Sequence, residues 1–159
     1  MPELRIGIVT CSDTRTAAED TAGIALREAA EARGWQVVAY RVVPDEFDRI
    51  AGEIVVQADS QHADVILTCG GTGLSPRDVT PEATLHVAKR PAPGIAEHIR
   101  AESLKITGRA MLSRAVAAVR GTTLVINLPG SKKAATESFG FVADQLEHAV
   151  EMMAGGGHG

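Results

Sequence analysis

Four short runs of apolar residues divide the chain and predict four β-strands. They cover residues 4–10, 36–43, 63–69 and 124–128. The first, third and fourth runs are almost continuously apolar, which is typical of strands buried on both faces of a sheet. In the longer segments between the runs, apolar residues recur at the three- and four-residue spacing of amphipathic helices.

Capping residues place the starts of the predicted helices. Asp20 or Thr21 is expected to cap the first helix. Asp45 stands where the N-cap of the second helix belongs, and Thr80 is expected at the cap of the third. Two more helices are predicted over roughly residues 94–106 and 132–153.

The alternation of strands and helices predicts an α/β fold with three layers, α/β/α, in which helices cover both faces of a mostly parallel sheet. Residues 1–153 are interpreted as one domain, and the glycine-rich residues 154–159 as a flexible C-terminal tail. Ligands of such folds bind beyond the carboxyl ends of the strands, near a topological switch point. The expected site therefore lies in the loops after the strands, residues 11–16, 44–46, 70–80 and 129–133.

Net charge and composition limit the classes of function that this chain is expected to have. The 16 Lys and Arg residues against 20 Asp and Glu residues give a net charge of −4, which argues against general nucleic-acid binding. A small phosphate pocket needs only a few backbone N–H groups and one or two cations, so it stays compatible with this charge. The sequence contains no apolar run of membrane-spanning length and no signal-peptide pattern at its start, and a cytoplasmic protein without membrane contact is expected.

Cysteine and histidine residues give no sign of a structural metal site. Cys11 and Cys69 end the first and third predicted strands and are expected to be buried free thiols. A redox pair or metal site there is the alternative interpretation. The five histidines show no ligand spacing, so no structural metal is predicted.

The loop GGTGLSPRD, residues 70–78, carries the strongest functional signal. Gly70, Gly71 and Gly73 allow the backbone to approach a ligand closely, and Thr72 and Ser75 add hydroxyl donors. A tight strand-to-helix turn would also explain the glycines. Neither the dinucleotide-binding fingerprint after the first strand nor a Walker P-loop is present, which disfavours dehydrogenases and Walker-type ATPases.

Several motifs along the chain closely resemble the molybdenum-cofactor biosynthesis domain family. They are GGTGLSPRDVTPEAT from residue 70, MLSRAV over 111–116, INLPGSKKA over 126–134 and the opening TCSDTR over 10–15. The resemblance implies an α/β domain that binds molybdopterin, a pterin with a dithiolene and a terminal phosphate. Active members transfer AMP from ATP to that phosphate with Mg²⁺. A relative that binds molybdopterin without efficient turnover is the alternative.

The resemblance assigns the catalytic and metal-holding roles to Asp45 and Asp78, which match the acidic positions of the family's PDE and RD motifs. Carboxylates that hold Mg²⁺ would screen the charges of two polyanionic substrates. Helix capping is the competing explanation for Asp45. For Asp78 the competing explanation is a pair with Arg77 or a bond within the turn.

The remaining expected contacts are with molybdopterin or ATP. Ser12 and Asp13 would hold substrate, with a side-chain turn as the equal alternative. Arg77 could form a bidentate contact with phosphate. The expected substrate-binding residues are Ser12, Asp13, Gly70, Gly71, Thr72, Gly73, Ser75, Arg77, Pro129, Gly130, Ser131 and Lys132.

Ser131 and Lys132 begin a predicted helix, where free N–H groups and cations form an anion site, although lysines at a helix start are often only solvated. Ser113 and Arg114 are explained equally well by packing, subunit contact or substrate contact. The resemblance also implies a homotrimer, with a hexamer as the alternative, and a separate molybdate-insertion protein as a possible partner.

Overall fold

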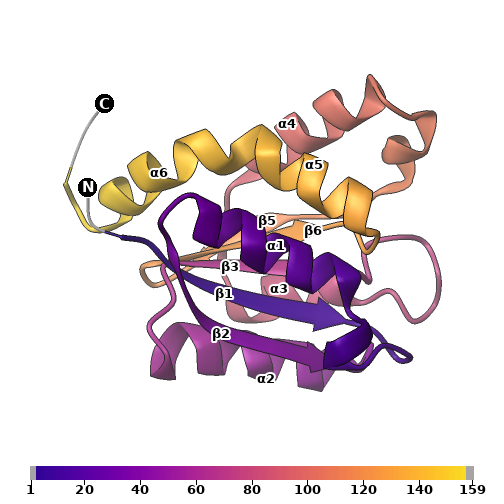
Figure 1. The fold of residues 1–159 in the computed structure, drawn as a ribbon, viewed down its shortest axis with the longest axis horizontal. Coiled ribbons are helices and arrows are strands. Elements are labelled where there is room, and N and C mark those ends of the chain that lie inside the picture. Colours follow the sequence, from indigo (N-terminus) through magenta and orange to yellow (C-terminus); the bar gives the residue numbers. More distant parts are fainter. Residues whose placement is uncertain (1–2, 157–159) are drawn as a thin grey trace.

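A computed structural model describes residues 3–156, which form a six-stranded mixed sheet in the order β2-β1-β3-β6-β5-β4 (Figure 1). Four neighbouring strands run parallel to one another. They are β2 (Gln36–Val43), β1 (Arg5–Cys11), β3 (Val65–Cys69) and β6 (Thr123–Leu128). The other two, β5 (Ala117–Arg120) and β4 (Arg90–Pro91), pair antiparallel at one edge.

Helices cover both faces of the sheet, which confirms the three-layer α/β/α prediction (Figure 1). One face carries α1 (Thr21–Ala32), α4 (Pro93–Leu104), α5 (Lys132–Val142) and α6 (Leu146–Met153). The other carries α2 (Phe47–Val55) and α3 (Thr80–Val87). Short 3₁₀ segments cover Ala17–Glu19, Gly108–Leu112 and Ala143–Gln145, and Val56–Ser60 is a π-helical turn.

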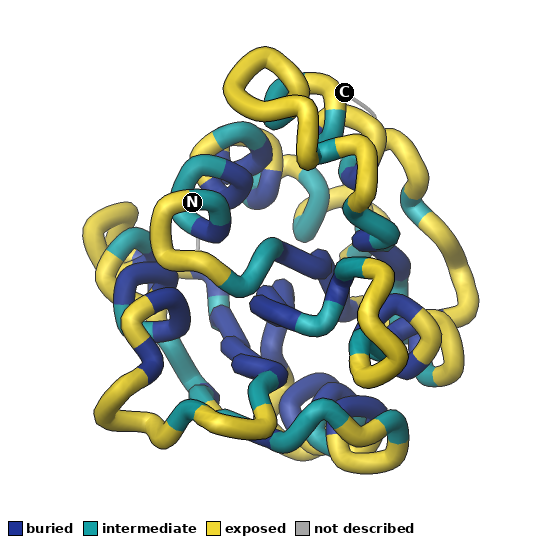
Figure 2. The backbone as a smooth tube through the Cα atoms, turned by 90° about the vertical axis from the view of Figure 1, so that its right-hand side faces the viewer, coloured by how far each residue is buried: buried dark blue, intermediate teal, exposed yellow. Residues whose placement is uncertain are grey.

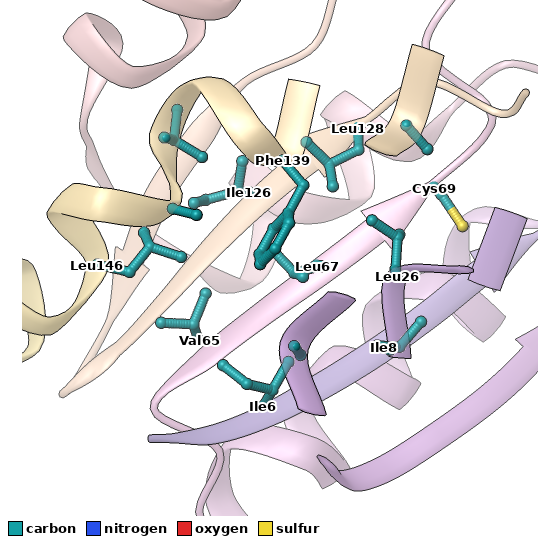
Figure 3. Packing of buried hydrophobic residues seen from close by; sticks show 14 of the residues in the cluster. Ile6, Ile8, Leu26, Val65, Leu67, Cys69, Ile126, Leu128, Phe139 and Leu146 are labelled. Atoms are coloured by element: carbon teal, nitrogen blue, oxygen red, sulfur yellow. The ribbon is translucent and has the colours of Figure 1, made fainter. Parts of the chain in front are cut away.

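The central strands form two aliphatic cores because successive side chains point to opposite faces. Ile6 and Ile8 of β1 face α1 and α5, whereas Val9 faces the α2 and α3 side. Phe139 of α5 packs over Leu67 in the first core (Figure 3). Figure 2 shows the buried strands at the centre and the exposed loops at the rim. Cys11 and Cys69 are buried and free, as predicted.

The four predicted strands and the mostly parallel sheet are confirmed, but β4 and β5 were missed. Both are short, and the sequence AAVR of β5 has no extended run of bulky apolar residues. The single helix predicted over 132–153 is wrong, since a 3₁₀ turn at Ala143–Gln145 separates α5 from α6. No helix in the described part of the chain is both long and apolar enough to cross a bilayer.

The capping predictions have mixed outcomes. Asp20 caps α1, where its carboxylate accepts a hydrogen bond from the Gly23 N–H at 3.0 Å. The prediction for Asp45 as a cap is wrong, because Glu46 occupies the N-cap position of α2 and its side chain accepts no hydrogen bond there. The prediction for Thr80 is also wrong, since Thr80 is already helical and follows Val79 at the cap position.

The predicted tail begins where α6 ends. Gly155 and Gly156 donate backbone hydrogen bonds to the carbonyls of Met152 and Glu151. Residues 157–159 of that predicted tail lie outside the described residues.

Candidate functional site

The topological switch point of the sheet lies between β1 and β3. The chain passes from β1 to β2 on one side and then returns to place β3 on the other side. Because β1, β2, β3 and β6 are parallel, the loops that follow them meet at one edge of the sheet. This is the position at which open α/β sheets bind ligands.

Close backbone contacts explain why glycines stand at positions 70 and 130. Gly70 and Gly71 have positive φ angles of 97° and 71°. A Cβ at Gly70 would lie 2.5 Å from the Cys11 carbonyl oxygen, too close for any side chain. A Cβ at Gly130 would lie 3.3 Å from the Gly70 Cα, so the loops after β3 and β6 also touch. A side chain is thus excluded at Gly70, and the space for one at Gly130 is tight.

Asp13 joins the loops after β1, β2 and β3. Its carboxylate accepts hydrogen bonds from Arg77 Nε at 3.0 Å and from Arg77 Nη2 at 2.9 Å. It also accepts a bond of 2.9 Å from the Asp45 backbone N–H. Bonding to the Arg77 guanidinium lowers the pKa of Asp13. Asp13 therefore connects elements far apart in sequence and does not form the local turn considered above.

Asp45 is the acid of the site whose carboxylate lacks a hydrogen-bond partner at a buried oxygen. That oxygen is Oδ1. Burial raises the pKa of Asp45, and the negative charges of Asp13 and Asp78 raise it further. An unpartnered buried carboxylate oxygen is costly and calls for a ligand, an ion or a donor.

Asp78 makes a bond within its own loop. Its Oδ2 accepts a hydrogen bond from the Ser75 N–H at 3.1 Å, and a Cβ at Gly73 would lie 2.9 Å from the same oxygen. The expected turn bond is therefore present. The expected pair with Arg77 is not, because Arg77 forms its ion pair with Asp13.

The other predicted contact residues occupy the same edge. Ser12 Oγ accepts bonds from the Thr14 and Arg15 N–H groups and forms a local turn. Ser131 caps α5 through the Ala134 N–H at 3.2 Å, and Lys132 is an exposed residue in the first turn. Arg15 donates to the Gly130 carbonyl at 2.8 Å and ties the loop after β1 to the loop after β6.

Arg114, which lies outside the glycine-rich loop of residues 70–78, forms hydrogen bonds to the backbone of that loop. Its guanidinium donates to the Gly73 carbonyl at 2.8 Å, to the Asp78 carbonyl at 2.6 Å and to the Glu82 carboxylate of α3. Its backbone N–H donates to the Thr72 carbonyl. The sequence left Arg114 open between packing, subunit contact and substrate contact, and the structure shows hydrogen bonds and an ion pair within the same chain.

A cavity of about 340 Å³ adjoins the predicted contacts Thr72, Gly73 and Pro129. Its other lining comes from α4, the 3₁₀ turn after it and the residues before β5, together with Asn127 of β6 and Ala134 of α5. Among these, Arg100, Ser103, Thr107 and Arg109 add polar side chains. Sequence reasoning missed them because they lie in a helix and a connection, not in loops that follow parallel strands.

Within residues 3–156, no three His, Cys, Asp or Glu side chains gather closely enough to enclose a metal ion by themselves. Mg²⁺ does not need such a cage, since it is commonly held by one or two carboxylates together with substrate phosphates. The unpartnered Oδ1 of Asp45 fits that mode of binding, with Asp78 close enough to raise the pKa of Asp45.

Comparison with known proteins finds relatives named for molybdenum cofactor synthesis. Over 159 residues the chain is 35% identical to the molybdopterin adenylyltransferase of Helicobacter pylori, covering 98% of this chain and 90% of that protein. It is 41% identical over 156 residues to the molybdenum cofactor synthesis protein cinnamon of Drosophila melanogaster, covering 96% of this chain. This chain spans only 26% of cinnamon and 16% of gephyrin from Dictyostelium discoideum.

Solved structures and the family match cover nearly the whole fold. The molybdopterin biosynthesis enzyme MoaB from Thermus thermophilus has a TM-score of 0.87 and 46% identity, covering 96% of this chain and 97% of that one. Residues 7–148 match the family described as a probable molybdopterin binding domain. The chain therefore belongs to the molybdenum-cofactor biosynthesis family.

Proposed function

We propose that this protein transfers AMP from ATP to the terminal phosphate of molybdopterin and releases pyrophosphate. The observation that carries the proposal is the buried, unpartnered Oδ1 of Asp45 where the loops after β1, β2 and β3 converge. Relatives named molybdopterin adenylyltransferase, which align over most of this chain, support the choice of reaction.

The reaction requires alignment and charge compensation more than proton transfer. An oxygen of the molybdopterin phosphate attacks the α-phosphorus of ATP, and the bond from that phosphorus to the bridging oxygen breaks. Pyrophosphate leaves with the electron pair of the broken bond. Because the attacking phosphate is already ionised at neutral pH, no general base is needed. The protein contributes positioning and electrostatic stabilisation.

Asp45 and Asp78 are the residues that would hold Mg²⁺. When bound, Mg²⁺ would neutralise charge on the phosphates and orient the α-phosphate. The raised pKa of Asp45 is consistent with a carboxylate that lacks its cation. In this proposal the backbone N–H groups of Gly71, Thr72 and Gly73, with the hydroxyls of Thr72 and Ser75, bind phosphate oxygens at the loop after β3. Gly70 contributes close backbone approach, because its own N–H donates to the Leu128 carbonyl.

Arg77 and the loop after β6 would supply the positive charge. Arg77 is exposed and held by Asp13, so a phosphate can compete for its guanidinium. Pro129, Gly130, Ser131 and Lys132 bring a helix N-terminus and a lysine to the same edge. The cavity of about 340 Å³ between α4 and the glycine-rich loop has room for the bicyclic pterin.

A molybdopterin-binding protein without efficient turnover is the second candidate, supported by the family match over residues 7–148, whose description names molybdopterin binding alone. Pyrophosphate release from ATP separates the two. An enzyme releases pyrophosphate only when molybdopterin is supplied. In Asp78→Asn this release should be abolished while molybdopterin binding persists. Wild-type turnover in that variant would remove Asp78 from the mechanism.

Assembly is a further part of the proposal. We expect a homotrimer, with a hexamer of two stacked rings as the alternative and a separate molybdate-insertion protein as the downstream partner. Exposed apolar residues support self-association, and they gather at the end of α4 and in the connection after it: Leu104, Ile106, Met111 and Leu112. Light scattering measures the mass directly, and a monomer at micromolar concentration would contradict the expected assembly.

A further inference from the structure

Asp20, the cap of α1, is a fully buried acid next to the loop after β1. Its Oδ2 accepts hydrogen bonds from the Thr10 and Tyr40 hydroxyls, each at 2.5 Å, and its Oδ1 accepts the Gly23 N–H. A Cβ at Gly23 would collide with the Asp20 carboxylate, so the absence of a side chain there makes room for the acid. All of these partners are donors, which suits a carboxylate that carries its negative charge.

Helix capping does not require that charge. Asparagine or serine caps a helix about as well as aspartate does. A buried ionised carboxylate costs free energy unless hydrogen bonds and an opposite charge compensate it. The hydroxyls supply part of the compensation, because burial and the Asp20 carboxylate raise the pKa of Tyr40 and keep its phenol protonated. The negative charge of Asp20 therefore points to a cationic partner.

Arg15 is that partner. Its Nη1 lies 3.9 Å from Asp20 Oδ1, beyond hydrogen-bond distance, and its side chain is only 35% exposed. The same Nη1 donates to the Gly130 carbonyl at 2.8 Å. Arg77, by contrast, commits two N–H groups to the Asp13 carboxylate. Asp20 thus attracts the Arg15 guanidinium through a weakly screened charge and leaves its N–H groups to bond Gly130.

Arg15 connects the loop after β1 to the loop after β6, beside the glycine-rich loop. Gly130, whose carbonyl Arg15 bonds, lies against Gly70, since a Cβ at Gly130 would be 3.3 Å from the Gly70 Cα. The Gly70 N–H in turn donates to the Leu128 carbonyl at 3.1 Å. The spacing of the two loops assigned to phosphate above therefore depends on a contact that Arg15 makes.

We propose that Asp20 is a positioning residue of the site: its buried charge orients the Arg15 guanidinium, and Arg15 holds the loop after β6 against Gly70 before substrate binds. The value of this arrangement for AMP transfer rests on the proposed function. The contacts themselves belong to the ligand-free protein and are testable apart from the reaction. Because Asp20 acts through Arg15, losing either residue should have the same consequence as losing both.

The test is amide hydrogen exchange, measured by NMR in the ligand-free protein. The reporter amides are those of Gly70 and Ala134, whose acceptors lie at the end of β6 and in the loop after it. We expect exchange at both to be about tenfold faster in Asp20→Asn, in Arg15→Gln and in the double variant. Arg15→Lys keeps the charge and a donor for the Gly130 carbonyl and should stay near wild type.

Two controls separate this effect from a general loss of stability. The Asp64 N–H, which donates to the Arg5 carbonyl at the amino ends of the strands, should exchange at the wild-type rate in every variant. Arg33→Gln is the matched variant, because it breaks an exposed arginine–aspartate pair, with Asp144, at the far end of α1. It should leave exchange at both reporter amides unchanged.

Unchanged exchange in folded Asp20→Asn, or effects of the single variants that multiply in the double variant, would overturn the proposal. Asp20→Ser keeps a cap and carries the same expectation if Asp20→Asn does not fold. In the AMP-transfer assay, Asp20→Asn and Arg15→Gln should each raise KM for ATP about tenfold and change kcat less than about twofold, because the loops lose preorganisation. If wild type transfers no AMP, the proposed function fails while the exchange result still decides the role of Asp20.

Discussion

Arg77 and Asp13 form a bidentate ion pair, with Nε to Oδ2 at 3.0 Å and Nη2 to Oδ1 at 2.9 Å. The pair connects the loop after β3 to the loop after β1 across the switch point of the sheet. The same Asp13 carboxylate accepts the Asp45 N–H. The exposed carboxylate of Asp13 therefore holds the backbone of Asp45 in place. It also restrains the Arg77 guanidinium, a group that can bind phosphate.

Asp13→Asn should lower the pKa of Asp45, because it removes a negative charge that raises it while keeping a side-chain oxygen for the Asp45 N–H. The ¹³Cγ shift of Asp45 measures this. Glu46→Gln is the control, since Glu46 is exposed and adjacent in sequence. An Asp45 pKa that rises or stays fixed in Asp13→Asn would show that the Asp13 charge does not act on Asp45.

Asp45→Asn should keep the protein folded while AMP transfer falls at least about 100-fold. Asp45 does not cap α2, so no helix cap is lost. The pKa of Asp45 is raised in the folded protein, and its contribution to stability is therefore largest below the unfolded pKa and is lost as pH rises through the folded pKa. The variant should gain stability relative to wild type as pH rises across that window.

Thermal unfolding of Asp45→Asn and wild type between pH 3 and pH 8 measures this difference, with Asp48→Asn at an exposed position of α2 as the control. A stability advantage that shrinks as pH rises would contradict the raised pKa. Wild-type activity in folded Asp45→Asn would remove Asp45 from the mechanism.

Arg114→Lys should lower the thermal midpoint by roughly 2–4 °C, because lysine cannot reproduce the bonds to the Gly73 and Asp78 carbonyls together. Activity per folded molecule should fall as well, since these bonds hold the glycine-rich loop. Glu82→Gln keeps both carbonyl bonds and should have the smaller effect on each quantity. Equal losses in the two variants would assign the role to the ion pair with Glu82.

Gly71→Ala should destabilise the fold by about 1–2 kcal/mol, because its φ of 71° disfavours a side chain and the new Cβ would collide with Thr80 Oγ1. Gly140→Ala is the control at an exposed position of α5, where a Cβ meets no atom within 4 Å. It should stabilise the helix by roughly 0.5–1 kcal/mol. Chemical denaturation gives both values, and a neutral Gly71→Ala would show that the loop tolerates a side chain.

Much of the fold could be predicted because each of the four parallel strands is a distinct apolar run between helical segments. Their parallel direction places the loops that follow them at one edge of the sheet. β4 and β5 escaped prediction because Arg90–Pro91 is too short and β5 is rich in small residues. The 3₁₀ turn that begins at Ala143 was not predicted, because the helical spacing of apolar residues continues through Val142, Leu146 and Val150 without Gly or Pro.

The residues of the candidate site could be named from motifs, but their pairings could not. Asp13 and Arg77 are 64 positions apart, and no local pattern links them. The unpartnered state of Asp45 depends on burial by other segments, which sequence spacing does not reveal. Asp45 and Thr80 were predicted as helix N-caps because Asp and Thr are common at that position. In the structure, tertiary contacts instead place both side chains beside Gly71.

The most direct test of the account is product analysis after mixing the purified protein with ATP, Mg²⁺ and molybdopterin. The account predicts adenylylated molybdopterin by mass spectrometry and one pyrophosphate released per product, with no release when molybdopterin is omitted. Tight binding of molybdopterin without AMP transfer, under conditions in which a molybdopterin adenylyltransferase control turns over, would contradict the central claim and favour the binding protein.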